Sequence, residues 1–255
     1  MKIVAIIPAR WASTRLKTKV LADIGGKPMV QHVWENVKQV KEIDDVIVAV
    51  DRIRIKKTVE SFGGKAIMTS EDNTSGTDRI VELLDKIEGD IFLNVQADEP
   101  LLSPNMIEEL IQVFDYEPNT QVATLVKRIE QKEDIKDPNV VKVVIDRRGY
   151  ALYFSRSPIP YLQGENRETY LTDQGKEEIS DRFFKHIGVY AYTRSFLKTF
   201  SNFPRTTLEM EEKLEQLRIL EHGYRIKTVE TRYDVMSVDT YEDLEKVRLL
   251  WEQRV

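Results

Sequence analysis

The sequence predicts an α/β fold, a doubly wound and mostly parallel sheet with a smaller antiparallel subdomain. Strand-like apolar runs alternate with amphipathic segments through the first half, which is the pattern of β-α-β units. The opening run, residues 3–7, carries no charge and ends at Pro8, as a buried strand would. Beyond Pro138, residues 140–145 and 151–155 flank a short polar turn and indicate an antiparallel hairpin.

The remaining elements follow from apolar periodicity and from glycine, proline and capping residues. Gly25 and Gly26 turn the chain, Pro28 suits a first helical turn, and Gly223 suits a helix end. Strands are expected at residues 3–7, 45–50, 65–68, 90–95, 122–126, 140–145, 151–155, 183–193 and 225–231. Helices are expected at 28–40, before 63–64, and at 78–87, 104–114, 208–222 and 239–254.

Length and composition limit the possible functions. The 255 residues suit one domain, with an antiparallel insertion at about 138–195. There is no cysteine, so disulfides, thiolate metal sites and cysteine nucleophiles are excluded. The net charge of -5 argues against nucleic acid or an anionic membrane as partner. No apolar run is long enough to span a bilayer, so we expect a cytoplasmic protein.

A basic loop follows the first strand. It carries Arg10, Arg15 and Lys19, with Ser13 and Thr14 between them. Ligands bind at the carboxyl ends of parallel strands, and cations with hydroxyls there suit a polyphosphate. The loop lacks the glycines of a nucleotide-binding fingerprint, so side chains would hold the phosphates. The alternative is a solvated basic loop.

Acidic residues follow another predicted strand. Asp98 and Glu99 come directly after residues 90–95, and Mg²⁺ commonly binds one or two carboxylates together with substrate phosphates. Both residues are also plausible turn and cap residues before the next helix. Asp239 follows a short apolar stretch, where helix capping is the alternative to metal binding.

Other polar groups have a structural and a functional interpretation. Glu209, Glu212 and Gln216 are spaced to share one face of one helix, which could be a solvated face. A second set, on strands, could line a polar pocket or be structural, and consists of Arg156, His186 and Tyr190. Residues 75–79 enter a helix, where backbone amides could bind an anion or simply be capped.

Taken together, these segments resemble the 3-deoxy-manno-octulosonate cytidylyltransferases, or CMP-Kdo synthetases. The matching segments, in family order and nearly end to end, are PAR (8–10), STRL (13–16) with Lys19, GKPM (26–29), SGTDR (75–79), NVQADEP (94–100), YFSRSPIP (153–160), HIGVYAY (186–192), LEQLR (214–218) and SVDT (237–240). Ala97 departs from the glycine usual in the family, and residues 163–176 match no motif.

The resemblance implies an enzyme with the nucleotidyltransferase fold that uses Mg²⁺. The enzyme would be a homodimer and act in the cytoplasm. It would transfer CMP from CTP to the anomeric hydroxyl of 3-deoxy-manno-octulosonate (Kdo), releasing pyrophosphate, for lipopolysaccharide synthesis. The catalytic residues would be Arg15, Lys19, Asp98 and Asp239, with Asp98 and Asp239 holding metal. The nucleotide would contact Pro8, Ala9, Arg10, Ser13, Thr14, Arg15, Lys19, Ser75, Gly76, Arg79, Gln96 and Asp98. The acceptor sugar would contact Arg156, His186, Tyr190, Glu209, Glu212 and Gln216.

Two other functions compete with this one. A related nucleotidyltransferase could use sialic acid or a sugar 1-phosphate, although the glycine-rich loop of sugar 1-phosphate enzymes is missing here. A noncatalytic nucleotide-sugar binding protein could share the fold. The presence of Arg15, Lys19, Asp98 and Asp239 together disfavours the second alternative.

Overall fold

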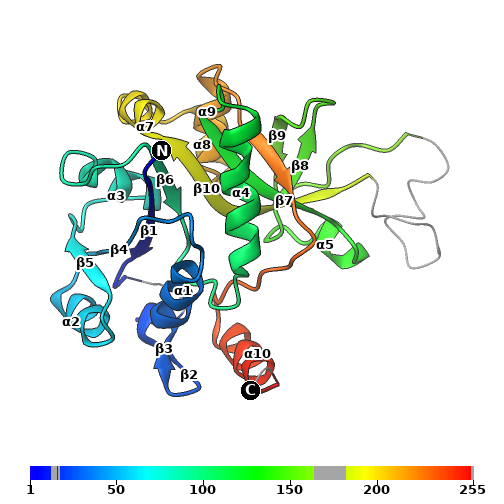
Figure 1. The fold of residues 1–255 in the computed structure, drawn as a ribbon. Coiled ribbons are helices and arrows are strands. Elements are labelled where there is room, and N and C mark those ends of the chain that lie inside the picture. The colour runs from blue at the N-terminus through cyan, green and yellow to red at the C-terminus, as the bar shows by residue number, and fades with distance from the viewer. Residues whose placement is uncertain (13–15, 17, 164–181, 254–255) are drawn as a thin grey trace.

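The fold is built on one nine-stranded sheet, mainly parallel at its centre, in a computed structural model that describes residues 1–12, 16, 18–163 and 182–253 (Figure 1). The main strand order is β11-β7-β10-β6-β1-β4-β5. Six strands of this order run in one direction: β1 (Ile3–Ala9), β4 (Asp45–Val50), β5 (Lys65–Met68), β6 (Ile91–Asn94), β7 (Val122–Arg128) and β11 (Lys227–Glu230). The long strand β10 (Phe184–Thr193) runs against β6 and β7. The predicted fold class is confirmed.

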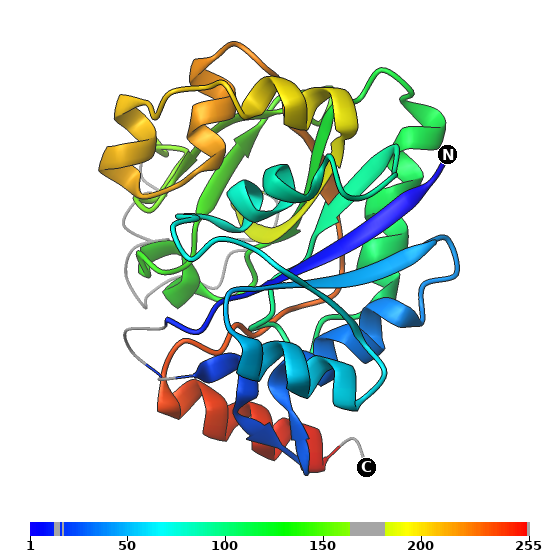
Figure 2. The same ribbon diagram turned by 90° about the vertical axis from the view of Figure 1, so that its left-hand side faces the viewer.

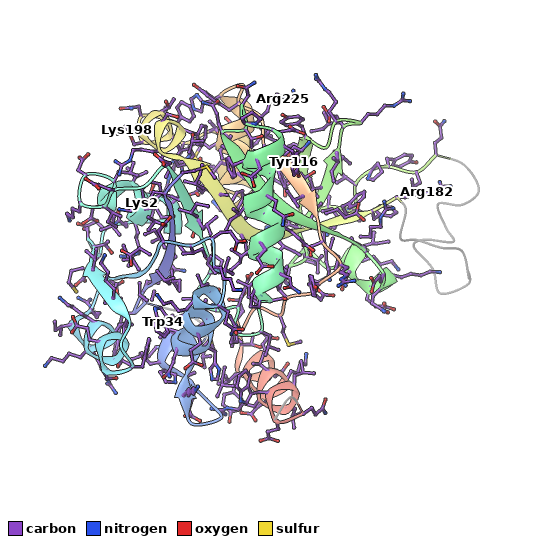
Figure 3. All side chains as sticks on the ribbon, in the orientation of Figure 1. Lys2, Trp34, Tyr116, Arg182, Lys198 and Arg225 are labelled. Atoms are coloured by element: carbon purple, nitrogen blue, oxygen red, sulfur yellow. The ribbon has the colours of Figure 1, made fainter. Side chains whose placement is uncertain are left out.

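Both faces of the sheet are covered by helices, as the period of two along β1 requires. Ile3, Ala5 and Ile7 belong to one apolar core, and Val4 and Ile6 to the other. The first core includes residues of α1 (Met29–Lys38), α2 (Ile53–Ser61) and α4 (Pro104–Tyr116), and the second those of α3 (Gly76–Leu83), α7 (Arg194–Phe200) and α9 (Gln216–Glu221) (Figures 1 and 2). Trp34 on α1, labelled in Figure 3, packs with its ring centroid 5.5 Å from that of Phe62.

The antiparallel part is a hairpin joined to the main sheet. β8 (Lys142–Ile145) pairs with β9 (Ala151–Ser155) and with the start of β10. Lys142 is fully buried there, and its ammonium donates to the carbonyl groups of Asp137 and Val140 at 2.8 and 2.6 Å. The hairpin predicted from sequence is present, while the division of the chain at 138–195 stays a prediction.

A small satellite unit joins the two ends of the chain. The two-stranded hairpin of β2 (Asp23–Ile24) and β3 (Lys27–Pro28) lies against α10 (Tyr241–Glu252) in both views (Figures 1 and 2). Its separate apolar core includes Ile24, Val238 and Leu244. A short 3-10 helix, η1 (Lys19–Leu21), leads into the hairpin. Lys19 lies at the start of η1, and Asp239 lies just before α10.

The prediction of one continuous helix at residues 208–222 is wrong. Residues 208–222 form two short helices, α8 (Thr207–Glu212) and α9, because Lys213 adopts left-handed backbone with φ of 56°. The structure also contains α5 (Lys132–Lys136) and α7, which the sequence patterns did not indicate. Among the described residues, no helix is both long and apolar enough to cross a membrane.

The β2–β3 turn gives a test of the satellite unit. A Cβ at Gly25, where φ is +57°, would lie 2.7 Å from Nε1 of Trp251 on α10. We expect Gly25→Ala to lower the free energy of unfolding by about 2–4 kcal/mol, through backbone strain and displacement of the indole ring. Urea unfolding measures the loss.

The matched control for that variant is Gly26→Ala. Gly26 also has positive φ, +85°, but a Cβ there meets none of the described atoms within 4 Å. It should therefore lose only about 1–2 kcal/mol, the cost of the left-handed backbone. Equal losses for the two variants would contradict the contact between the turn and α10.

Candidate functional site

The carboxyl ends of β1 and β6 form the wall of a first cavity. Ile6 pairs with Asn94 in parallel register, so the segments that follow, Pro8–Arg10 and Gln96–Asp98, lie side by side. The cavity has a volume of about 190 Å³. Its lining residues are Pro8, Arg10, Lys19, Val20, Asn73, Thr74, Ser75, Gly76, Arg79, Gln96, Ala97 and Asp98. Eight of these were predicted as nucleotide contacts; Ala9 is buried in β1, and Ser13, Thr14 and Arg15 lie outside the described residues.

The wall opposite β1 is the start of α3. Ser75 caps this helix, accepting from the backbone N–H of Asp78, whose carboxylate accepts from the N–H of Ser75 in return. A Cβ at Gly76 would lie 3.1 Å from Pro8 and 3.3 Å from the amide oxygen of Asn94. Glycine thus keeps the helix start close to the strand ends. The capped helix start that the sequence allowed is present, and it also lines the cavity.

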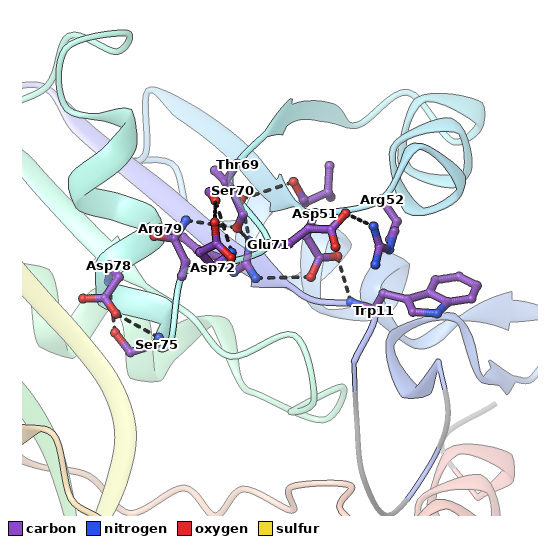
Figure 4. A network of polar contacts seen from close by, with 12 residues as sticks. Trp11, Asp51, Arg52, Thr69, Ser70, Glu71, Asp72, Ser75, Asp78 and Arg79 are labelled. Atoms are coloured by element: carbon purple, nitrogen blue, oxygen red, sulfur yellow. Dashed lines mark hydrogen bonds and ion pairs between the residues drawn. The ribbon is translucent and has the colours of Figure 1, made fainter.

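Arg79 supports the cavity through a buried ion pair. Its guanidinium is 3.2 Å from the Asp51 carboxylate and donates to Thr69 and to the carbonyl group of Ser70 at 2.7 and 2.9 Å (Figure 4). The other Asp51 oxygen accepts from the backbone N–H of Trp11 at 2.8 Å (Figure 4). Arg79 therefore links the loop after β1 to the loop before α3.

Asp98, Asp239 and Lys19 meet at the edge of this cavity. The Lys19 Nζ lies 2.6 Å from an Asp98 oxygen and 2.9 Å from an Asp239 oxygen. Burial alone would lower the pKa of Lys19, but the charges and hydrogen bonds of the two carboxylates raise it above its ordinary value. The lysine is therefore charged, and its ammonium bridges two acidic groups far apart in the sequence.

The backbone holds these two carboxylates together. The N–H of Val238 donates to the carbonyl oxygen of Asp98 at 2.9 Å, and Thr240 caps α10 directly after Asp239. Helix capping at this point thus belongs to Thr240, while the Asp239 side chain faces Lys19. Both predicted metal ligands lie where one small cation can reach them.

The donor set fits magnesium. Two carboxylate oxygens within 2.6 and 2.9 Å of a single nitrogen can approach one cation, and Mg²⁺ usually takes its other ligands from water and phosphates. No group of three or more acidic or imidazole side chains within the described ranges forms a complete protein cage. Asp98 and Asp239 are therefore the residues that would hold a metal, with substrate oxygens completing its shell.

A second cavity of about 550 Å³ adjoins the first. Gln96 and Asp98 line both. The second cavity is otherwise lined by Glu99, Asn139, Val140, Val141, Arg156, Lys185, His186, Ile187, Gly188, Lys213, Asp234, Val235, Ser237 and Asp239. The acidic pair thus lies between two cavities, one beside the basic loop and one beside β9 and β10.

Arg156 is held rigidly at the wall of the second cavity. Its Nε donates to the carbonyl oxygen of Glu212 and its Nη1 to that of Pro138, both at 2.8 Å. The Glu212 carboxylate accepts from the Arg156 backbone N–H at 2.9 Å and from the Ser155 hydroxyl at 2.6 Å. Burial opposes ionisation, but these bonds lower the pKa of Glu212 below its usual value. Glu212 therefore positions Arg156.

The structure separates the three residues expected on one helix face. The break at Lys213 divides them, and Glu209 forms a buried ion pair with Arg218. Gln216 is buried at the start of α9. Within the described residues, neither of the two cavities is lined by Tyr190, Glu209, Glu212 or Gln216. Their predicted contacts with the sugar stay predictions.

His186 presents a neutral ring to the second cavity. It lies deep in the protein with one edge at the cavity, and burial lowers its pKa to about 3. Its Nε2 is 3.0 Å from the Thr124 hydroxyl, and its ring centroid is 5.3 Å from that of the buried Tyr190. The imidazole can therefore hydrogen-bond a ligand without adding charge.

Several lining residues were missed from sequence. Lys185 directly precedes His186 and forms ion pairs at 3.1 Å with Asp134 and with Asp234. Glu99, which the sequence did indicate beside Asp98, also lines this cavity, and burial together with the Asp98 charge raises its pKa to about 8. Lys185 could have been suspected from its place beside His186, but its acidic partners are remote in sequence.

The buried imidazole predicts a pH dependence of stability. Below about pH 6.5 the unfolded chain binds a proton on His186, while the folded protein does not until about pH 3. Stability should therefore fall as pH drops through that window. Between pH 7 and 5, His186→Gln should lose about 1–2 kcal/mol less stability than wild type in urea unfolding.

The control for this pH experiment is the same substitution at His222. That ring stacks on Phe203 with centroids 4.1 Å apart, away from the two cavities. His222→Gln should keep the wild-type difference in stability between the two pH values. If His186→Gln behaves as this control does, the imidazole is not kept neutral by burial.

Comparisons with known proteins agree with this architecture. The cytidylyltransferase family profile matches residues 4–228. Proteins named 3-deoxy-manno-octulosonate cytidylyltransferase from Geotalea uraniireducens (strain Rf4) and Geobacter sulfurreducens (strain ATCC 51573 / DSM 12127 / PCA) are 51% and 49% identical, each over 97% of this chain and 98% of the relative. A solved CMP:2-keto-3-deoxy-manno-octonic acid synthetase complexed with CTP is 45% identical and superimposes with a TM-score of 0.90 over 100% of both chains. The chain therefore belongs to the 3-deoxy-manno-octulosonate cytidylyltransferase family.

Proposed function

We propose that this protein transfers CMP from CTP to the anomeric hydroxyl of Kdo and releases pyrophosphate. The observation that carries the proposal is the meeting of two cavities at Asp98 and Asp239. The first is flanked by Arg10 and Lys19, and the second contains Arg156. Two substrates bound in adjoining cavities can react where the cavities meet.

In this proposal the first cavity holds the nucleotide. The start of α3 and Gln96 offer hydrogen-bonding groups to base and sugar, and Arg10 and Lys19 offer positive charge to the phosphates. Arg79 is committed to Asp51, Thr69 and Ser70, so its part is to keep the wall in place. Arg15, Ser13 and Thr14 are proposed to contact the triphosphate, as expected from the family resemblance.

The second cavity holds the acceptor. Arg156 supplies a positive charge for the carboxylate of a sugar acid, while the neutral His186 can hydrogen-bond a sugar hydroxyl. The sugar hydroxyl oxygen attacks the α-phosphorus, the bond to pyrophosphate breaks with its electron pair leaving on pyrophosphate, and the hydroxyl proton passes to solvent. The residues bind, orient and neutralise, as suits phosphoryl transfer.

We further propose that Asp98 and Asp239 hold Mg²⁺. When bound there, the ion would neutralise phosphate charge and lower the pKa of the attacking hydroxyl. The acidic pair with two reachable oxygens supports this assignment.

The biological setting is also a proposal. We infer a homodimer that acts in the cytoplasm and supplies activated Kdo for lipopolysaccharide, with chains pairing through residues 138–195. In that segment Leu152 and Tyr161 are 62% and 68% exposed, and a second chain that packs there would cover them.

The acceptor is tested directly with CTP, Mg²⁺ and candidate sugars. Pyrophosphate release should require a sugar acid, proceed with Kdo, and be at least about a hundred-fold slower with sialic acid or a sugar 1-phosphate. Transfer of CMP to sialic acid without transfer to Kdo would contradict the assignment of Kdo as the acceptor. Binding of CTP without pyrophosphate release in the presence of any acceptor would favour the noncatalytic binding protein.

The metal assignment is tested with Asp98→Asn. This variant keeps the shape of the side chain but removes one carboxylate, so pyrophosphate release should fall about a hundred-fold or more, with unchanged far-UV circular dichroism. Asp115→Asn, on the exposed face of α4, is the matched control and should keep wild-type turnover. Near-normal turnover by Asp98→Asn would argue against the metal role.

A further inference from the structure

Lys19 lies where a metal ion would need to be. Its nitrogen touches one oxygen of Asp98 and one of Asp239 at 2.6 and 2.9 Å, the same pair of carboxylates proposed as metal ligands. Because the lysine is charged, a divalent cation bound to those oxygens would lie a few ångströms from an ammonium, and the two would repel strongly. The ammonium and the metal therefore compete for the same oxygens.

The backbone limits how far the two carboxylates can separate to relieve this competition. The backbone hydrogen bond from Val238 to Asp98 fixes one main chain against the other. The apolar core of the satellite unit, which contains Val238 and Leu244, holds the start of α10 in place. Two acidic groups held this close need a counter-charge in the free protein, and among the described residues Lys19 contributes one.

The first cavity offers the Lys19 ammonium an alternative position. Lys19 lines this cavity together with Arg10, where the phosphates of a nucleotide are proposed to bind. Its four-carbon side chain can swing toward an anion without moving the backbone. A triphosphate entering that cavity would offer the ammonium new partners and release the carboxylates.

We propose that Lys19 is a tethered counter-cation that keeps divalent metal off Asp98 and Asp239 until a nucleoside triphosphate draws the ammonium away. Metal binding by the free protein is therefore weak, and nucleotide and metal bind cooperatively. Each raises the affinity of the other by the same factor. This inference rests on the proposed metal and nucleotide sites and adds an order to their filling.

The test measures metal binding without nucleotide. Mn²⁺ stands in for Mg²⁺, because the same oxygen ligands suit it, and electron paramagnetic resonance counts the free ion. Lys19→Met removes the ammonium without adding a ligand oxygen. It should bind Mn²⁺ at least about ten-fold more tightly than the wild type does.

Two further variants locate the effect. Lys27→Met is the matched control, because Lys27 pairs with Glu35 at 2.8 Å and lines neither of the two cavities in the described part of the chain. It removes the same unit of charge and should leave Mn²⁺ affinity within about two-fold of wild type. Asp98→Asn added to Lys19→Met should abolish the gain. If Lys19→Met does not fold, as judged by circular dichroism, Lys19→Leu, which also adds no ligand oxygen, carries the same test.

Mn²⁺ affinity of the folded Lys19 variants that equals wild type would overturn the inference. A gain that is equally large in Lys27→Met, or that survives Asp98→Asn, would overturn it too. These outcomes are separate from the proposed function. Turnover of wild-type protein with CTP and Kdo, together with unchanged Mn²⁺ affinity in Lys19→Met, rejects the counter-cation and keeps the transferase.

Discussion

The hydrogen bond between the backbone of Val238 and that of Asp98 is the constraint on which the site depends. It joins the end of β6 to the start of the last helix, two segments separated by most of the chain. A bond of this kind is worth only about 1 kcal/mol, so it needs the apolar core around Val238 to persist. The satellite unit of β2, β3 and α10 thus acts on the site from a distance. It keeps the main chains that carry the two carboxylates side by side.

Holding Asp98 and Asp239 close together raises their electrostatic repulsion. Two carboxylates held within reach of one nitrogen repel each other, and the neighbouring Glu99 responds to burial and to the Asp98 charge with a pKa raised to about 8. The site tolerates this arrangement because Lys19 is drawn into it from the satellite unit. Under the proposed function, the same repulsion between the carboxylates would favour binding of a metal ion once Lys19 is drawn away.

The sequence predicted the sheet better than the short elements. Strand β1 was visible as an uncharged run with a proline and basic residues after it, and the alternation of elements indicated the doubly wound class. The break at Lys213 was invisible because a lysine gives no local signal for left-handed backbone, and the helical pattern continues through it. Tertiary contacts determine the break in the helix, because Glu209 pairs with Arg218 and Glu212 accepts a hydrogen bond from Ser155. Resemblance to a family indicated Asp98 and Asp239, but no pattern indicated the bridging contact of Lys19.

Two of the cations that line the cavities, Arg156 and Lys19, behave differently, and the difference follows from the groups that hold them. Arg156 is fixed by backbone carbonyl groups and by Glu212, so its charge stays at one place whether or not a sugar acid is present. Among the described residues, the Lys19 ammonium is held by two carboxylates at the end of a flexible stem, so its position depends on which anions compete for it. Under the proposed function, the acceptor cavity is thus preorganised, while the nucleotide cavity would exchange ionic partners. An acceptor that entered first would find its cation in place but would meet an acidic pair still neutralised by Lys19, which the proposed order of binding assigns the nucleotide to draw away.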